Sequence, residues 1–216
     1  GTWSNLGTGD ITLGGNVSNA GAINLNANGA GCTTDDIAIT STAGQRTWSG
    51  AGSFTLVDLN VTNQGGSMTA YSSTNTSGNG WTFNAGCIYT ISGTCYTDEG
   101  VTTMAAGRAV AIKVNGAGTY TANTNGSGAY SIPNIVAAAG NIVTVFINGA
   151  TEDATTVTRM GSADLSGLNL YQNHVIVRSE DGSPLTIVNM AQYDSDQDAD
   201  ITFDAEDAAT DTLDVD

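Results

Sequence analysis

The sequence predicts an all-β protein, in which an N-terminal solenoid-like stack of short strands precedes a C-terminal β-sandwich. Short apolar alternations with a period of two recur along the 216 residues, as between Leu59 and Val61, and this period is typical of half-buried strands. Clusters of Asn and Gly separate them, and such clusters favour turns. Near residue 88 the strands become longer and more evenly apolar, which indicates a second domain.

In the first domain, predicted over residues 1–87, apolar residues recur in pairs at alternate positions. The pairs are Ile11/Leu13, Ile23/Leu25, Ile37/Ile39, Phe54/Leu56, Leu59/Val61, Met68/Ala70 and Trp81/Phe83. A single short strand cannot bury its apolar face alone, so we expect successive strands to stack as the coils of a solenoid. Because the spacing is irregular, an antiparallel sandwich is the alternative interpretation.

The second domain, predicted over residues 88–174, contains five strand-like runs separated by turn residues. Such a series favours a β-sandwich. Asn125-Gly126-Ser127-Gly128 lies between two runs and predicts a hairpin. The runs are residues 88–96, 109–114, 119–122, 128–132 and 142–147.

Several of these segments resemble the carboxypeptidase-regulatory-like family of transthyretin-like, Ig-like β-sandwiches. The most recognisable is Thr121-Ala122-Asn123-Thr124-Asn125-Gly126-Ser127-Gly128-Ala129-Tyr130-Ser131-Ile132, flanked by Ile91–Thr94, Ala109–Ile112 and Ala139–Val145. In the first domain, the stretch Thr47–Thr55 is similar to repeats of long bacterial and archaeal surface proteins with β-solenoid arrays. The two resemblances imply a non-catalytic spacer or adhesin module on a cell surface.

Residues 175–216 are predicted to form terminal strands followed by an acidic tail. Val175–Arg178 and Leu185–Val188 read as a strand pair, and Ala199–Asp204 as a last strand. From Ala205 onward the chain has too few apolar residues to form its own core. We expect this end either to fray or to dock on a neighbour.

The charge balance disfavours nucleic acids and anionic membranes as partners. The chain has 5 Lys and Arg against 21 Asp and Glu, a formal net charge of −16, and this charge repels phosphate groups. We expect no membrane span, because no stretch approaches the ~20 apolar residues that one requires. The Asn/Gly-rich, Lys-poor composition is typical of surface proteins, so we expect an extracellular location.

Three cysteines, Cys32, Cys87 and Cys95, allow one disulfide. We favour Cys32 with Cys87, which would tie the two ends of the first domain together. A Cys87–Cys95 bond and three buried free thiols are the alternatives.

Asp194, Asp196, Asp198 and Asp200 stand at alternate positions and form a candidate metal site. Ca²⁺ takes six to eight oxygen ligands, and a tight loop could supply several of them from these side chains. The pattern departs from an EF-type loop, because Ala199 stands where Gly is expected. The alternative is an acidic loop that is simply solvated.

Trp48 and Trp81 are candidates for carbohydrate binding, because flat aromatic faces suit sugar rings. Packing within the core is the alternative role. We expect no enzyme and predict no catalytic residue, because His174 is the only histidine and no Gly-x-Ser-x-Gly motif occurs.

The sequence therefore predicts an extracellular structural protein, a subunit or module of a surface filament, stalk or layer. Copies of the chain would associate head to tail by strand addition, through Gly1–Leu13 or Ala199–Asp214. The alternative function is an adhesin or carbohydrate-binding module with glycans as partners.

Overall fold

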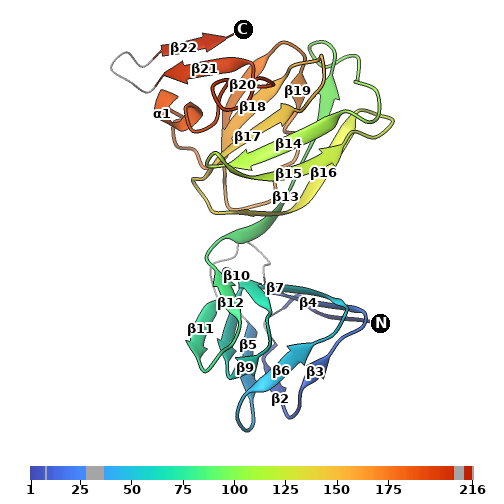
Figure 1. The fold of residues 1–216 in the computed structure, drawn as a ribbon, viewed down its shortest axis with the longest axis vertical. Helices are drawn as coiled ribbons and strands as arrows, with labels where there is room; N and C mark the ends of the chain where they lie inside the picture. The colour runs from blue at the N-terminus through green and yellow to red at the C-terminus, as the bar shows by residue number, and fades with distance from the viewer. Residues whose placement is uncertain (8, 28–36, 207–211, 216) are drawn as a thin grey trace. The chain divides into compact units, whose positions relative to one another are not determined.

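The computed structural model describes residues 1–7, 9–27, 37–206 and 212–215 and is nearly all-β, with 52% strand and 2% helix (Figure 1). The all-β prediction is confirmed. The chain divides into two compact units, Gly1–Ile88 and Tyr89–Asp216, which are described separately below. The second unit includes the described residues after 174, for which the sequence predicted a separate terminal region.

The first unit contains three parallel sheets. The first sheet has the order β1 (Thr2–Asn5), β4 (Ala22–Asn26), β7 (Ser53–Val57), β10 (Thr69–Tyr71) and β12 (Thr82–Asn84). The second has the order β11 (Thr74–Ser77), β8 (Leu59–Thr62), β5 (Ile37–Ser41) and β2 (Ile11–Leu13). The third has the order β3 (Val17–Ser18), β6 (Arg46–Ser49) and β9 (Gln64–Gly65).

From β1 to β10, successive strands go to successive sheets, and the chain returns to the first sheet with every third strand, at β4, β7 and β10. Each return adds a parallel neighbour, so that Ala22 pairs with Ser53 in the first sheet and Ile37 with Leu59 in the second. In β4, β5 and β8 the period-two pattern places one face inside: Leu25, Ile39 and Val61 are fully buried. Burying such a side chain contributes roughly 1.5–3 kcal/mol.

Single residues in the left-handed backbone region turn the chain from one sheet to the next. Asp58 follows β7 with φ 56°, Asn63 follows β8 with φ 56°, and Ser72 follows β10 with φ 44°. The backbone N–H groups of all three residues donate to the following turn of the stack, to Tyr71, Ser77 and Asn84. Asn and Asp tolerate this conformation better than most residues.

Three indole rings pack together at the third sheet. Trp48 is 1% exposed, and its ring meets that of Trp81 edge-on at 5.1 Å and stacks on that of Trp3 at 6.3 Å. The buried indole N–H of Trp48 donates to the Gln64 side-chain oxygen at 2.9 Å, and Gln64 donates in turn to the Thr62 carbonyl. The indole N–H of Trp48 and the side-chain amide of Gln64 are thereby paired inside this core.

The second unit contains a three-stranded sheet, a five-stranded sheet and a hairpin. The three-stranded sheet has the order β16 (Ala129–Ala137), β13 (Cys87–Tyr96) and β19 (Leu170–Tyr171). The five-stranded sheet has the order β15 (Ala117–Asn123), β14 (Ala109–Val114), β17 (Ile142–Ile147), β18 (Thr155–Arg159) and β20 (Val175–Ser179). The hairpin joins β21 (Phe203–Glu206) to β22 (Thr212–Val215), and the helix α1 (Ile187–Met190) precedes it.

The central strand β17 is buried along its whole length, so layers cover both faces of its sheet. On one face Phe146 packs with Met190, Tyr193 and Phe203 of the C-terminal segment. The ammonium of Lys113 lies 4.8 Å from the centre of the Tyr193 ring on this side. The three-stranded sheet approaches the five-stranded one where Thr156 donates to the Asn169 carbonyl.

Two local predictions for this unit are wrong. The predicted strand over Leu185–Val188 is instead the start of α1, because Thr186 caps the helix and exchanges hydrogen bonds with Asn189. The turn at Asn125–Gly128 does not close a hairpin within one sheet, since β15 and β16 belong to different sheets.

We expect Trp48→Ala to lower the free energy of unfolding of the first unit by about 3–5 kcal/mol, the usual loss for a buried Trp. The change also leaves the Gln64 side chain without its indole donor. Chemical denaturation followed by far-UV circular dichroism measures the loss. Trp3→Ala is the control, because Trp3 is 39% exposed, and an equal loss in both variants would contradict the assignment.

Candidate functional site

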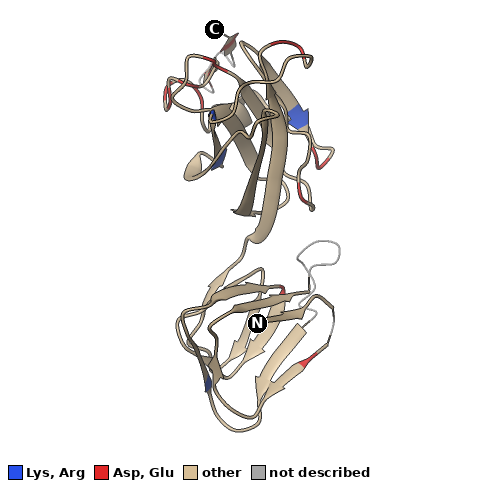
Figure 2. Ribbon diagram, turned by 90° about the vertical axis from the view of Figure 1, so that its right-hand side faces the viewer, with Lys and Arg blue, Asp and Glu red and all other residues tan. Residues whose placement is uncertain are grey.

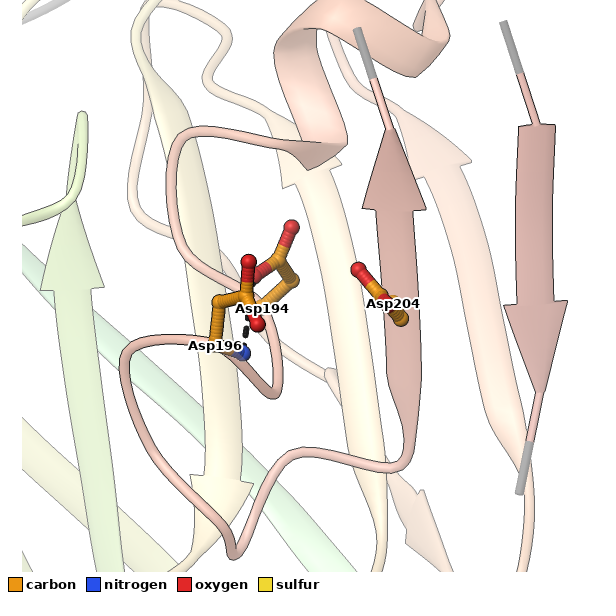
Figure 3. A group of neighbouring side chains, drawn as sticks. All are labelled: Asp194, Asp196 and Asp204. Carbon is orange, nitrogen blue, oxygen red and sulfur yellow. Dashed lines mark hydrogen bonds between the residues drawn. The ribbon is translucent and has the colours of Figure 1, made fainter. Parts of the chain in front are cut away.

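Three carboxylates of the second unit converge into an acidic triad, which we define as Asp194, Asp196 and Asp204. One oxygen from each lies within 4.8 Å of the others. Asp194 and Asp196 come from the loop after α1, and Asp204 comes from β21 (Figure 3). Asp194 is buried, Asp204 is half-buried and Asp196 is exposed, so the triad is open to solvent on one side.

Backbone hydrogen bonds hold Asp194 in place. Its Oδ1 accepts from the Asp196 N–H at 3.1 Å, and its Oδ2 accepts from the Ala205 N–H at 3.3 Å. The Asp194 N–H donates to the Gln197 side-chain oxygen at 2.8 Å. The loop is thus fastened both to itself and to β21, which carries the third carboxylate.

The electrostatics of the triad favour a cation. Burial raises the pKa of Asp194, and the negative charges of Asp204 and Asp196 raise it as well. The two backbone N–H donors lower it, but the pKa stays above its usual value. A hard cation would relieve the repulsion, because oxygen-only ligand sets suit Ca²⁺ and Mg²⁺. The three side chains can therefore hold a metal ion.

The structure brings together only two of the four acids predicted as ligands. Asp198 accepts from the Tyr193 hydroxyl at 3.0 Å, and Asp200 accepts from the Gly149 N–H at 2.6 Å, so both are engaged away from the triad. The prediction that one tight loop would present all four acids together is wrong, because the turns of this segment direct Asp198 and Asp200 to other partners. Sequence reasoning missed Asp204 as a ligand, although it lies in the predicted strand Ala199–Asp204.

Trp48 and Trp81 do not form an exposed platform for sugars. They are 1% and 6% exposed, and both belong to the apolar core of the first unit. The prediction that they bind carbohydrate through their ring faces is corrected for this reason: those faces pack against other core side chains.

Among the cysteines, Cys95 is a free thiol buried in the second unit, which excludes the alternative Cys87–Cys95 disulfide. Burial raises the pKa of this thiol to about 12, so it is not reactive at neutral pH. The favoured Cys32–Cys87 disulfide lies outside the described residues, because Cys32 does.

The strands of the first turn, β1, β2 and β3, stand at one end of the three parallel sheets. Each has one paired edge and one edge without a partner among residues 1–7, 9–27 and 37–206. The residues of β1 are mostly exposed, including Trp3 at 39%, and the neighbouring Leu6 is 62% exposed. We call these three strands the open edge.

The charged residues gather in the second unit, and few occur in the first (Figure 2). The described part of the first unit carries Arg46, Asp10 and Asp58. Within the described residues, no helix combines the length and the apolar character that crossing a membrane requires.

The chain was compared with protein-family models, curated proteins and solved structures, and none of the three comparisons gave a match. The interpretation of the site therefore depends on its geometry alone.

We expect Ca²⁺ to raise the melting temperature at neutral pH, because a cation bound at the triad stabilises the native state by mass action. Asp196→Asn should reduce this shift, since it removes an exposed ligand with little effect on packing. Calorimetric melting in Ca²⁺ and in EGTA measures the effect. Identical melting of the unmodified chain in the two buffers would refute metal binding.

In EGTA, the stability of the unmodified chain relative to Asp194→Asn should fall as the pH rises. The pKa of Asp194 is raised from 3.8 in the folded state. The native state therefore binds the Asp194 proton more tightly than the unfolded state does. The resulting stabilisation is complete below pH 3.8 and is lost as the pH rises through the folded pKa. Urea denaturation of both proteins across this range measures the difference, and a flat or rising difference would contradict the assignment.

Proposed function

We propose that this chain is an extracellular structural protein, a subunit or module of a surface filament, stalk or layer in which copies associate head to tail. We further propose that the three parallel sheets of the first unit form a β-solenoid. The two packed sheets of the second unit are then an Ig-like sandwich similar to the carboxypeptidase-regulatory-like family.

The observation that carries this proposal is the open edge. The outward N–H and C=O groups of β1, β2 and β3, which have no strand partner within the described part of the chain, form a template on which a further strand can add. A stack of parallel sheets grows by repeating the pairing that it already contains, as between Ile23 and its neighbours Trp3 and Phe54. An added strand therefore meets a surface of the right geometry.

The second predicted segment for strand addition, Ala199–Asp214, is only partly suited to that role. Phe203 and Ala205 of β21 are buried in the core of the second unit, so this strand is already engaged. In β22, by contrast, Leu213 is 41% and Val215 is 51% exposed. We propose that β22 of one copy supplies the strand that adds to the open edge of the next.

Charge favours this head-to-tail arrangement over contact between like ends. The second unit carries most of the net charge of −16, so two such units repel each other, whereas the first unit is nearly neutral. A carbohydrate-binding role has less support, because Trp48 and Trp81 are buried.

We expect Ser4→Pro to abolish assembly without unfolding the first unit. The Gly1 carbonyl accepts from the Ala22 N–H, so by strand alternation the backbone N–H of Ser4 points away from β4. Proline there removes an outward donor, and edge strands tolerate proline. Negative-stain microscopy and sedimentation velocity at several concentrations measure assembly.

Ser4→Ala is the matched control, because it keeps the backbone donor, and it should assemble like the unmodified chain. Leu213→Ser tests the other partner surface and should weaken assembly. If the unmodified chain remains monomeric at all concentrations, the proposed function is wrong.

A further inference from the structure

A small pocket of about 200 Å³ lies at one edge of the second unit, where the chain passes from the edge strand β19 to the edge strand β20. Its lining residues are Glu99, Tyr171, His174 and Ile176. Sites for drug-sized ligands usually measure about 300–1,000 Å³, so this pocket accommodates one small chemical group. It shares no lining residue with the acidic triad.

Asp98 fastens the loop that carries Glu99 beside the Tyr171 ring. The Asp98 carboxylate accepts hydrogen bonds from three backbone N–H groups of this loop, at 2.7–3.1 Å. The bonds from Thr102 do most to lower the pKa of Asp98 to about 2, so the carboxylate stays ionised and bonded at neutral pH. A Cβ placed on Gly100 would lie only 3.4 Å from Cε1 of Tyr171, so the loop runs directly against this ring.

The turn after β19 fixes the other side of the pocket. The His174 N–H donates to the Tyr171 carbonyl at 3.0 Å, and Asn173 between them takes the left-handed conformation with φ 59°. The His174 ring is held as well, because its Nδ1 donates to the Gln172 carbonyl at 2.7 Å. The Tyr171 ring stacks on that of Tyr96, with centres 5.4 Å apart and planes 11° apart. The fold therefore sets the walls of the pocket before any ligand arrives.

Glu99 brings a negative charge without a counter-charge to this pocket. Its carboxylate has no hydrogen bond or ion pair within the described part of the chain. The basic side chains of the described second unit are engaged elsewhere, three in ion pairs and one over an aromatic ring: Arg108, Arg159, Arg178 and Lys113. A cation that neutralises Glu99 must therefore come from outside these residues, and the net charge of −16 attracts cations.

We propose that this pocket binds the quaternary ammonium group of a free, choline-like ligand, with the Tyr171 ring as its aromatic contact and Glu99 as its counter-charge. Aromatic rings attract such cations, and the aliphatic side chain of Ile176 suits their methyl groups. A Ca²⁺ ion takes six to eight oxygen ligands, whereas one carboxylate lines the pocket. A lysine ammonium is strongly hydrated and fits such walls less well. This inference does not depend on the proposed function or on the acidic triad.

The test is a nuclear magnetic resonance titration of the full chain with choline, followed through the backbone amides of Glu99, His174 and Ile176. We expect saturable shifts at these residues with a Kd on the order of 1 mM, as suits a ligand of few atoms. Dimethylbutanol, a neutral isostere in which carbon replaces the nitrogen, should bind about threefold to fivefold more weakly. Phosphocholine should also bind more weakly than choline, because the net charge of the chain repels its phosphate.

Glu99→Gln should weaken choline binding about threefold to fivefold, because it removes the counter-charge from an exposed position. Glu206→Gln is the matched control: it removes the same charge from an exposed position outside the pocket and should leave the affinity unchanged. Tyr171→Leu removes the aromatic contact and should abolish the shifts, whereas Tyr171→Phe keeps the ring and should bind choline like the unmodified chain.

Absence of shifts at the pocket residues would overturn the proposal, as would equal affinities for choline and dimethylbutanol. Tighter binding of phosphocholine than of choline would overturn the assignment to a free ligand. An affinity unchanged by Glu99→Gln would contradict the role of the carboxylate. If Tyr171→Leu fails to fold, Glu99→Gln and the neutral isostere decide the outcome, since neither alters the core.

Discussion

Parallel pairing between strands one turn apart is the constraint on which the first unit depends. The partners Ala22 and Ser53 are far apart in sequence, and no short segment buries its apolar face without the next turn. The corner residues Asp58 and Asn63 serve the same pairing, because their backbone N–H groups donate to the following turn. The stability of the first unit therefore comes mainly from contacts between successive turns of the stack. The turn at either end has a neighbouring turn on one side only, so it is the least stabilised.

In the second unit, the corresponding constraint is the double burial of β17. A strand with six buried residues requires a cover on each face, and the chain supplies one cover from its acidic C-terminal segment. Phe203 and Ala205 point into the core, and Asp204 between them points to the other side. Burial of the apolar residues thus decides where the carboxylates of this segment lie.

The same packing divides the acidic run between two places. Asp194 and Asp196 meet Asp204, while Asp200 is held beside Asp153 by the loop at Gly149. Like charges at such close range oppose folding unless protons or cations compensate them. A structural protein outside the cell would be exposed to calcium, so the proposed function and the acidic triad are physically compatible.

The sequence by itself determined the strands and their inward faces, because alternation with a period of two is a local property. Ile23, Ile37 and Leu59 occur in predicted pairs and are buried. The acids were visible in the sequence, but their grouping was not, since Asp204 joins the triad only when β21 packs on the sheet. Likewise, Trp48 suits either a sugar platform or a core, and only the stacking of turns around it excludes water from both ring faces. Tertiary structure decided these points because distances between residues far apart in sequence depend on packing, which no local pattern encodes.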